Sequence, residues 1–260
     1  MTLRHPARTA SFFGAALLGA ALIAAAAPGA AQQTLENSQS KFAGNNPQGN
    51  WSATVTRTER GHLLGNPKAE TKLIEFISYT CPHCADFAMK GDPAIDLTLL
   101  GPGKMSVEVR PVIRNAIDLT VTLLVQCGDP AGFKDRHRAF MYSQSQWLAK
   151  FMGAPRSQQE IWARGNKADR MNAASALGLA DILVQRGQSI SEVNACVMND
   201  AAVNKIMTAG AEDRGEFAIA GTPSFALDGK LLDEVHDWNA LYPVLSARFA
   251  AAGDGGAPKP

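Results

Sequence analysis

Two cysteines, Cys81 and Cys84, stand where a strand gives way to a helix, and they constrain this chain more than any other feature. The residues before them, 71–78, form a mainly apolar run that predicts a largely buried strand. Pro82 follows Cys81 directly, and proline suits the first turn of a helix. Because the N–H groups and the dipole at a helix start stabilise an anion, this position favours a thiolate on Cys81.

The two thiols occupy unequal positions, which suits thiol–disulfide exchange. A thiol of ordinary pKa, about 8.5, becomes a thiolate at neutral pH when a helix start and an imidazole act on it, and His83 supplies the imidazole. Cys84 lies one turn further in, where we expect a shielded, resolving thiol. If Cys81 titrates near ~4.5, its thiolate is favoured at pH 7 by about 3.4 kcal/mol, which makes the disulfide more oxidising by about 70 mV.

Two other interpretations of this pair stay open. A structural disulfide between residues three apart would close a small, strained loop and add little stability. A metal site would need further ligands, and neither the other cysteines nor His62, His137 and His236 stand at ligand spacing. We therefore predict no metal site and expect no bound cofactor.

The remaining cysteines, Cys127 and Cys196, lie 69 residues apart in a segment with helical spacing. In an oxidising compartment, a disulfide closing that loop would stabilise the fold by about 4 kcal/mol on the chain-entropy model. We expect a permanent structural disulfide. Two free, buried thiols are the alternative.

The first 31 residues have the pattern of an export signal. Basic residues precede an apolar run over 10–27, and small residues follow it up to Ala31. We expect cleavage after Ala31 and export to the periplasm, where disulfides persist. A retained membrane anchor is the alternative, because the run is close to the shortest that spans a bilayer.

The charge balance argues against a nucleic-acid partner. The chain carries 25 basic and 24 acidic residues, and the export segment contains Arg4 and Arg8 but no acid. The remainder therefore has 23 basic and 24 acidic residues, a net charge of −1. Without a net positive charge, there is no electrostatic case for binding a phosphate backbone.

The pattern along the chain predicts a small sheet domain interrupted by helices. Before the interruption we expect a loose segment over 32–50, an edge strand over 52–58, the buried strand, a helix over 82–100 with a bend near Pro93, and a strand over 105–112. After it we expect a hairpin of strands 223–227 and 230–233, a helix over 238–251 and a disordered tail over 252–260. The sheet domain then consists of 51–112 and 209–251, and the inserted helical domain of 113–208.

Two segments and the helical block carry a resemblance to a known family. The first segment, 73–84, reads Leu-Ile-Glu-Phe-Ile-Ser-Tyr-Thr-Cys-Pro-His-Cys, and the second, 221–229, reads Gly-Thr-Pro-Ser-Phe-Ala-Leu-Asp-Gly. Together they resemble the DsbA family of periplasmic thiol–disulfide oxidoreductases, including relatives from alphaproteobacteria that have a second disulfide. The resemblance implies an α/β, thioredoxin-like fold with an inserted helical domain.

The resemblance also implies roles for residues outside the cysteine pair. Pro223 matches a cis-proline that faces the disulfide, and the backbone of Thr222 would then pair with an extended substrate chain. Glu75 matches a buried acid near the redox pair, where a raised pKa would let it move protons for Cys84. An exposed acid at a strand edge is the alternative interpretation of Glu75.

The implied function is that of a monomeric oxidase whose Cys81–Cys84 disulfide passes to reduced or unfolded secreted proteins. A quinone-linked membrane partner similar to DsbB would reoxidise it. Thr222 departs from the valine frequent before the cis-proline in DsbA proteins, and threonine is more usual in isomerases. A disulfide isomerase or reductase on the same scaffold is therefore one alternative, and a metal-binding chaperone that uses the two thiolates is another.

Overall fold

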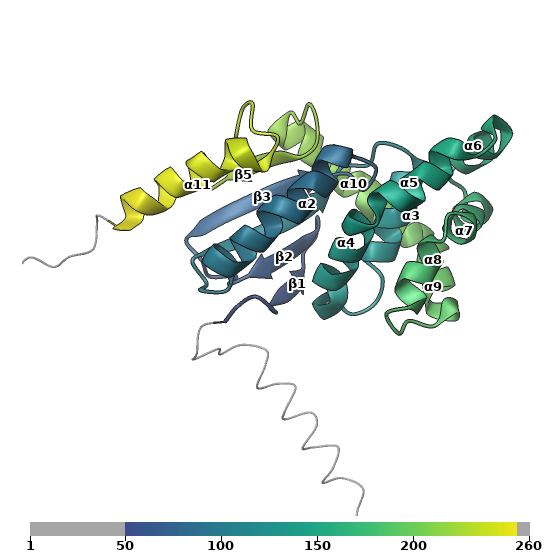
Figure 1. The fold of residues 1–260 in the computed structure, drawn as a ribbon, viewed down its shortest axis with the longest axis horizontal. Coiled ribbons are helices and arrows are strands. Elements are labelled where there is room, and N and C mark those ends of the chain that lie inside the picture. Colours follow the sequence, from purple (N-terminus) through teal and green to yellow (C-terminus); the bar gives the residue numbers. More distant parts are fainter. Residues whose placement is uncertain (1–49, 254–260) are drawn as a thin grey trace, which may run out of the picture. The chain divides into compact units, whose positions relative to one another are not determined.

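A parallel pair of strands joined by a helix forms the centre of the structure, a computed structural model that describes residues 50–253 (Figure 1). Strand β3 (Thr71–Ile77) pairs in parallel with β4 (Met105–Pro111), in register from Thr71 opposite Met105 to Ile77 opposite Pro111. Helix α2 (Pro82–Ile95) lies between them in the chain. The predicted strand–helix–strand unit is therefore confirmed, with each strand one residue shorter than expected.

Four further strands extend the sheet, whose order is β1-β2-β4-β3-β5-β6. Every pairing except that of β3 with β4 is antiparallel. The four strands are β1 (Val55–Arg57), β2 (His62–Gly65), β5 (Ser224–Leu227) and β6 (Lys230–Leu231). The edge strand and the hairpin agree with the sequence, but β2 was not expected. It is only four residues long, and His62 interrupts its apolar pattern, although the side chain is buried.

Helices cover both faces of the sheet. On one face α2 and α11 (Trp238–Gly253) enclose a core in which the ring of Phe87 lies 4.7 Å from that of Phe225 and 6.4 Å from that of Trp238. On the other face α10 (Asp200–Phe217) packs Phe217 against Phe76, with ring centroids 5.1 Å apart. Alternate residues of β3 therefore enter two different cores.

Helix α2 continues through a proline where the sequence predicts a bend. Pro93 lies inside the helix, which ends at Ile95 and passes into a π-helical turn, η1 (Asp96–Leu100). Proline removes one backbone hydrogen bond but does not by itself unfold a helix that is held by tertiary packing. Ile95 and Leu100 are both buried, so packing against the sheet maintains the helical path.

Seven short helices between β4 and α10 form the inserted helical part, which lies beside the sheet (Figure 1). They are α3 (Ala116–Val125), α4 (Phe133–Tyr142), α5 (Gln144–Gly153), α6 (Arg156–Ala163), α7 (Lys167–Ala176), α8 (Leu179–Val184) and α9 (Ile190–Val197), with a short 3-10 turn, η2 (Pro130–Gly132), before α4. The expected end of this part at 208 falls inside α10, so no break between helices marks it. That helix continues to Phe217, since Ala209, Asp213 and Phe217 are spaced by four and buried.

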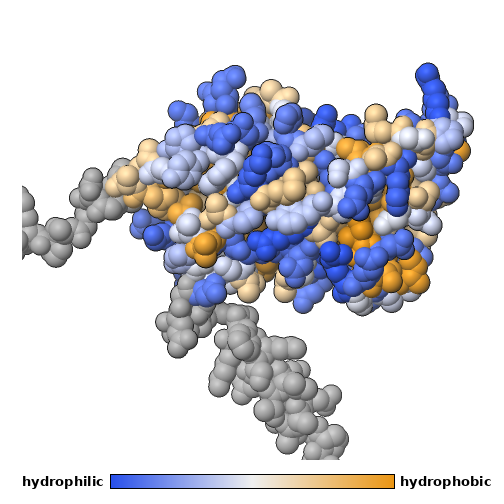
Figure 2. All heavy atoms as spheres, in the orientation of Figure 1, coloured by the Kyte–Doolittle hydropathy of each residue, from blue (hydrophilic) through white to orange (hydrophobic). Residues whose placement is uncertain are grey.

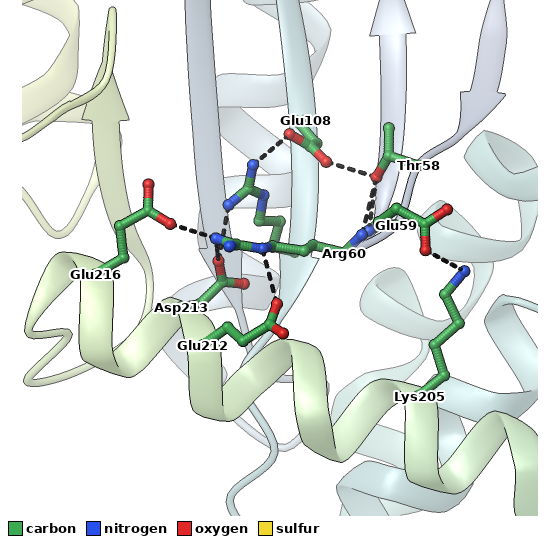
Figure 3. Close-up of polar contacts among 10 residues, drawn as sticks. Thr58, Glu59, Arg60, Glu108, Lys205, Glu212, Asp213 and Glu216 are labelled. Carbon is green, nitrogen blue, oxygen red and sulfur yellow. Dashed lines mark hydrogen bonds and ion pairs between the residues drawn. The ribbon is translucent and has the colours of Figure 1, made fainter.

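An ion-pair cluster attaches α10 to the sheet (Figure 3). The buried carboxylate of Asp213 accepts hydrogen bonds from Arg60 at 3.0 Å and from Arg110 on β4 at 2.7 Å. Arg60 also pairs with Glu216, and Arg110 pairs with Glu108 at 2.7 Å. The long helix that begins in the inserted part is thereby fixed against the sheet, through β4 and the loop between β1 and β2.

The outer surface of the described part is mixed, and hydrophobic side chains gather beside α11 and around α8 and α9 (Figure 2). Tyr242 on α11 and Ile190 on α9 are 58% and 55% exposed. No helix within residues 50–253 is long and apolar enough to cross a membrane. The predicted export segment 1–31, most of the leading segment 32–50 and the tail beyond Gly253 lie outside the described residues.

Candidate active site

Cys81 occupies the position before the first turn of α2. Its backbone is extended, with φ −98° and ψ 116°, and Pro82 is the first helical residue. The carbonyl of Cys81 accepts from the N–H of Cys84 at 3.1 Å, which closes the first turn. Cys81 therefore stands at the positive end of the helix, as the sequence predicts.

The surroundings of Cys81 favour its thiolate. A hydrogen bond from the Cys84 thiol is the largest cause, and the Thr222 side chain and the backbone N–H groups of Cys84 and His83 add to it. These bonds outweigh burial and lower the pKa of Cys81 to about 5. His83 acts here through its backbone N–H, and its side chain is exposed. The predicted electrostatic role of the His83 imidazole stays a prediction.

Cys84 is the more deeply buried member of the pair, since Cys81 is 3% exposed and Cys84 is not exposed. Its side chain is fully buried, and the N–H of Ser78 lies 3.4 Å from its sulfur. Burial, with the hydrogen bond to Cys81 as second cause, raises the pKa of Cys84 well above its ordinary value. Both thiols are free, so this is the reduced, dithiol form. The two pKa shifts run in opposite directions, as exchange through one attacking and one resolving sulfur requires.

The loop before β5 brings Thr222 against the cysteine pair. The peptide bond between Thr222 and Pro223 is cis, and the Cys81 thiol donates a hydrogen bond to the Thr222 carbonyl at 3.1 Å. A loop that is remote in the chain therefore meets the start of α2. Of the predicted substrate-binding pair, Thr222 contacts the reactive sulfur, and Pro223 follows it through the cis peptide bond.

Two residues of the inserted helices hold the loop that leads to Cys81, and the sequence did not single out either. Asp118 on α3 accepts from the Ser78 hydroxyl at 2.5 Å and from the Tyr79 N–H at 2.8 Å, and burial raises its pKa to about 6. Gln144 on α5 donates to the carbonyls of Tyr79 and Cys81 at 2.7 and 2.9 Å. An Asn-x-x-Asp helix start at Asn115 was visible in the sequence, but nothing indicated where Asp118 or Gln144 would point.

Glu75 points into the core beneath α2. It is 2% exposed, and its Oε1 has no hydrogen-bond partner among the described residues. Burial, with the negative charge of Asp92 as second cause, raises the pKa of Glu75 well above its ordinary value. Since β3 lies in the interior of the sheet, the alternative of an exposed acid at a strand edge is wrong.

Cys127 and Cys196 form a disulfide that joins the end of α3 to α9. Their Cα atoms are 5.7 Å apart, although 69 residues separate them in the chain. The alternative of two free thiols does not describe this structure. The disulfide encloses most of the inserted helices and is separate from the Cys81–Cys84 pair.

The described residues offer no group of three or more histidine, cysteine or acidic side chains placed to hold a metal ion. His137 and His236 each hydrogen-bond other protein groups, to Tyr79 and to the Pro223 carbonyl respectively. His62 stacks on Phe133, with ring centroids 3.9 Å apart. None of the three histidines faces the cysteine pair as part of a ligand set.

The fold and this site define a thioredoxin-fold protein with a redox-type Cys-x-x-Cys pair and an inserted helical part. A thioredoxin family model matches residues 57–247, and the chain belongs to this family. The fold class and the resemblance to DsbA-like proteins inferred from the sequence are thereby confirmed. The chemistry open to such a site is exchange between thiols and disulfides.

Relatives and solved structures agree with this assignment. A protein-disulfide isomerase from Novosphingobium aromaticivorans has 39% sequence identity and a TM-score of 0.70, and the match covers 73% of this chain and 97% of that one. Wolbachia pipientis alpha-DsbA1 has 20% identity and a TM-score of 0.58, covering 73% and 91% of the two chains, and shows the shared fold. A Rickettsia conorii protein named "Putative protein-disulfide oxidoreductase" is 28% identical over 169 residues, which are 64% of this chain and 53% of that protein. The chain thus spans about half the length of the curated relatives it matches.

Proposed function

We propose that this protein is a periplasmic thiol–disulfide oxidase that donates its Cys81–Cys84 disulfide to secreted proteins during their folding. The observation that carries the proposal is the pairing of a Cys81 thiol of pKa about 5 with a fully buried Cys84. A thiol that ionises so readily is a good leaving group, and its thiolate is stable at neutral pH.

The low pKa of Cys81 sets the direction of exchange. At pH 7 the thiolate is favoured over the thiol by about two pKa units, or about 2.7 kcal/mol. This energy stabilises the dithiol form alone, so it raises the reduction potential of the pair by about 60 mV. A disulfide whose reduced form is stabilised in this way accepts electrons from ordinary cysteines.

The proposed reaction begins at the sulfur of Cys81. A substrate thiolate attacks Cys81 Sγ of the disulfide, and Cys84 leaves as a thiolate that then takes up a proton. A second substrate thiolate attacks the substrate sulfur of this mixed disulfide and displaces the Cys81 thiolate. The substrate leaves with a new disulfide, and the protein is left with two reduced cysteines.

Thr222 supplies the contact for the substrate backbone in this reaction. Its carbonyl lies 3.1 Å from Cys81 Sγ and loses a donor when the thiol ionises. An N–H group of an extended substrate chain would replace that donor and bring the substrate sulfur beside Cys81. Backbone recognition of this kind suits many client sequences, because every chain carries N–H groups.

The proposed compartment and partner follow from the same redox logic. The export pattern of residues 1–31 and the Cys127–Cys196 disulfide both suit an oxidising compartment such as the periplasm. Each turnover leaves the protein reduced, so a membrane quinone reductase similar to DsbB would restore its disulfide. We propose a monomer as the working form.

Oxidation of a reduced, unfolded client tests this function. The oxidised protein is mixed with an equal amount of a reduced client that forms one disulfide, and the client thiols are counted over time. We expect rapid loss of client thiols. For Cys84→Ser prepared as a mixed disulfide at Cys81, we expect the sulfur bound to Cys81 to be transferred to a client thiol. A client that keeps its thiols in the presence of the oxidised protein would contradict the proposal.

A disulfide isomerase is the second candidate. Thr222 before the cis-proline favours it, and the Novosphingobium protein with 39% identity is named a protein-disulfide isomerase. Equilibration with a glutathione buffer measures the reduction potential, and a value near the roughly −270 mV of thioredoxin would point to a reductase on the same scaffold instead of an oxidase. Faster recovery of a client with scrambled disulfides than of a reduced client would favour the isomerase.

A further inference from the structure

The buried position of Cys84 creates a requirement for proton transfer. In the proposed function, on which this inference rests, Cys84 gains one proton and loses one in every catalytic cycle. Its side chain is fully buried, and Glu75, the acid that the resemblance places near the redox pair, is only 2% exposed. A proton that reaches Glu75 from Cys84 still has to cross the core to reach solvent.

A small cavity lies beside Glu75, between β3 and the end of α2. Its volume is about 20 Å³, and polar side chains of Glu75, Asp92 and His137 line it among apolar ones. A buried water molecule needs about 10–15 Å³ and two to four polar partners, so the cavity has room for one, and Glu75, Asp92 and His137 are the lining side chains from which we expect its partners. Glu75 and Asp92 can therefore exchange a proton through a single water.

Asp92 lies on the same side of α2 as Cys84. Cys84, Ala88 and Asp92 are spaced by four residues, which places them along one face of the helix. Asp92 is close enough to Glu75 for its charge to raise the pKa of Glu75. The Asp92 side chain is 20% exposed, whereas Glu75 is buried, so Asp92 connects the cavity to solvent.

His137 from the inserted helix α4 fixes the position of Asp92. Its Nε2 lies 3.5 Å from Asp92 Oδ2, and its Nδ1 lies 3.0 Å from the hydroxyl of Tyr79. Burial raises the pKa of Tyr79, so the phenol keeps its proton and is available as a hydrogen-bond donor to Nδ1. With Nδ1 accepting from Tyr79, the ring hydrogen lies on Nε2, the nitrogen nearer to Asp92.

The other charged groups at the cavity are already engaged. Lys134 and Arg138 both bind Asp96, at 2.5 and 3.1 Å. His62, on the neighbouring strand β2, is buried, and burial lowers its pKa to about 3, so it stays neutral. Within residues 50–253, His137 is the one cationic or potentially cationic side chain paired with Asp92.

We propose that Asp92, held by His137, relays the proton of Cys84 from Glu75 to solvent. When Cys84 acts as nucleophile, its S–H proton passes to the Glu75 carboxylate, and the Cys84 thiolate forms the bond to Cys81 Sγ as the partner sulfur leaves as a thiolate. Protonated Glu75 then gives its proton through the cavity to Asp92, and Asp92 releases it to water. The reverse transfers deliver a proton when Cys84 is the leaving group. Asp92 acts through Glu75, so it passes the proton between Glu75 and water and does not contact the reacting sulfurs.

Ring closure in the reduced protein isolates this step. Oxidised glutathione reacts with Cys81 to give a mixed disulfide, and attack by Cys84 then closes the Cys81–Cys84 disulfide and releases glutathione. Acid quenching and mass spectrometry follow the mixed disulfide from about pH 5 to about pH 9, a range that spans the pKa values of acids and thiols. The variants are Asp92→Asn and Asp92→Glu, and the matched control is Asp86→Asn, an exposed acid of the same helix that pairs with Lys90.

We expect D92N to slow closure about tenfold at pH 7, less than the roughly 10²–10⁴-fold effect of a direct general base. Its pH profile should shift to lower pH, because removal of the Asp92 charge lowers the pKa of Glu75. D92E should close at no less than about half of the wild-type rate, and D86N should close at the wild-type rate. The alkylation half-point of Cys81 should be the same in all these variants as in the wild type. A D92N closure rate within about twofold of wild type at every pH would overturn the relay. A wild-type protein that forms the mixed disulfide but never closes it would overturn the proposed function itself.

Discussion

The sulfur of Cys81 and the carbonyl oxygen of Thr222 lie 3.1 Å apart, although 141 residues separate them in the chain. The contact joins the start of α2 to the loop before β5, and the inserted helices lie between the two in sequence. The reactive sulfur and the backbone group that would bind substrate therefore belong to one site. A change at Thr222 therefore acts directly on the thiol chemistry.

Replacement of Thr222 by valine should make Cys81 harder to ionise. The Thr222 side chain contributes a hydrogen bond that lowers the pKa of Cys81, and valine has a similar shape without the hydroxyl. We expect the pKa of Cys81 to rise by up to about one unit, which lowers the reduction potential by up to about 30 mV. Alkylation kinetics across pH and equilibration with glutathione measure the two quantities.

Thr222→Ser is the matched control for this prediction, because serine keeps the hydroxyl. Both the pKa of Cys81 and the potential should stay close to wild type in T222S. An unchanged alkylation profile in T222V would show that the hydroxyl does not act on Cys81.

The stability of the protein should respond to Glu75 in a pH-dependent way. The folded pKa of Glu75 lies above its unfolded value, so the folded state holds a proton that the unfolded state has already lost, and wild-type stability falls as pH rises above about 4.5. Glu75→Gln cannot titrate, so it should gain on wild type by about 1.4 kcal/mol for each unit of the pKa difference. Urea unfolding at pH 4 and pH 8 measures this gain, and an equal difference at both pH values would exclude a raised pKa.

The central strands and the cysteine pair could be predicted because local pattern determines them. The apolar run before Cys81 specifies a buried strand, and Pro82 specifies the helix start. Position 223 was inferred from a family motif, since a lone Thr-Pro pair has no distinctive local signal. Asp118 and Gln144 could not be found, because their contacts with the loop depend on how the inserted helices pack against the sheet.

The boundary of the inserted part shows the same limit. Helical spacing continues from α9 into α10, but the pattern does not tell which partner the helix packs against. The switch from the inserted helices to the sheet occurs within α10, where Asp213 meets Arg60 and Arg110. Asp92 and His137 were missed for a similar reason, because they lie 45 positions apart and meet only through the packing of α4 on α2.

Removal of the Cys127–Cys196 disulfide should lower stability without removing the redox pair. On the chain-entropy model, a disulfide across 69 residues is worth about 4 kcal/mol. The double variant Cys127→Ala/Cys196→Ala should lose about this much free energy of unfolding in guanidinium, and it should still oxidise a client. A loss below about 1 kcal/mol would show that the bridge hardly constrains the unfolded chain.

The reduced protein should become more stable relative to the oxidised protein as pH rises from 5 to 7. The folded pKa of Cys81, about 5, lies below its unfolded value near 9, so the stabilisation is complete above about pH 9 and is lost as pH falls through about 5. Between pH 5 and pH 7 the difference should grow by about 2–3 kcal/mol. Glu75 and Asp118 titrate in both redox forms, so their effects largely cancel in the comparison. Urea unfolding of both forms at the two pH values tests this, and a constant difference would contradict it.

The pH dependence of alkylation at Cys81 in the reduced protein tests the central claim most directly. Iodoacetamide reacts with the thiolate, and mass spectrometry of the cleaved chain assigns the product to Cys81 and separates it from Cys84. The stabilised thiolate predicts a half-point near pH 5 for Cys81. A half-point near about 8.5, the value of an ordinary cysteine, would contradict the claim that this site is built to accept electrons.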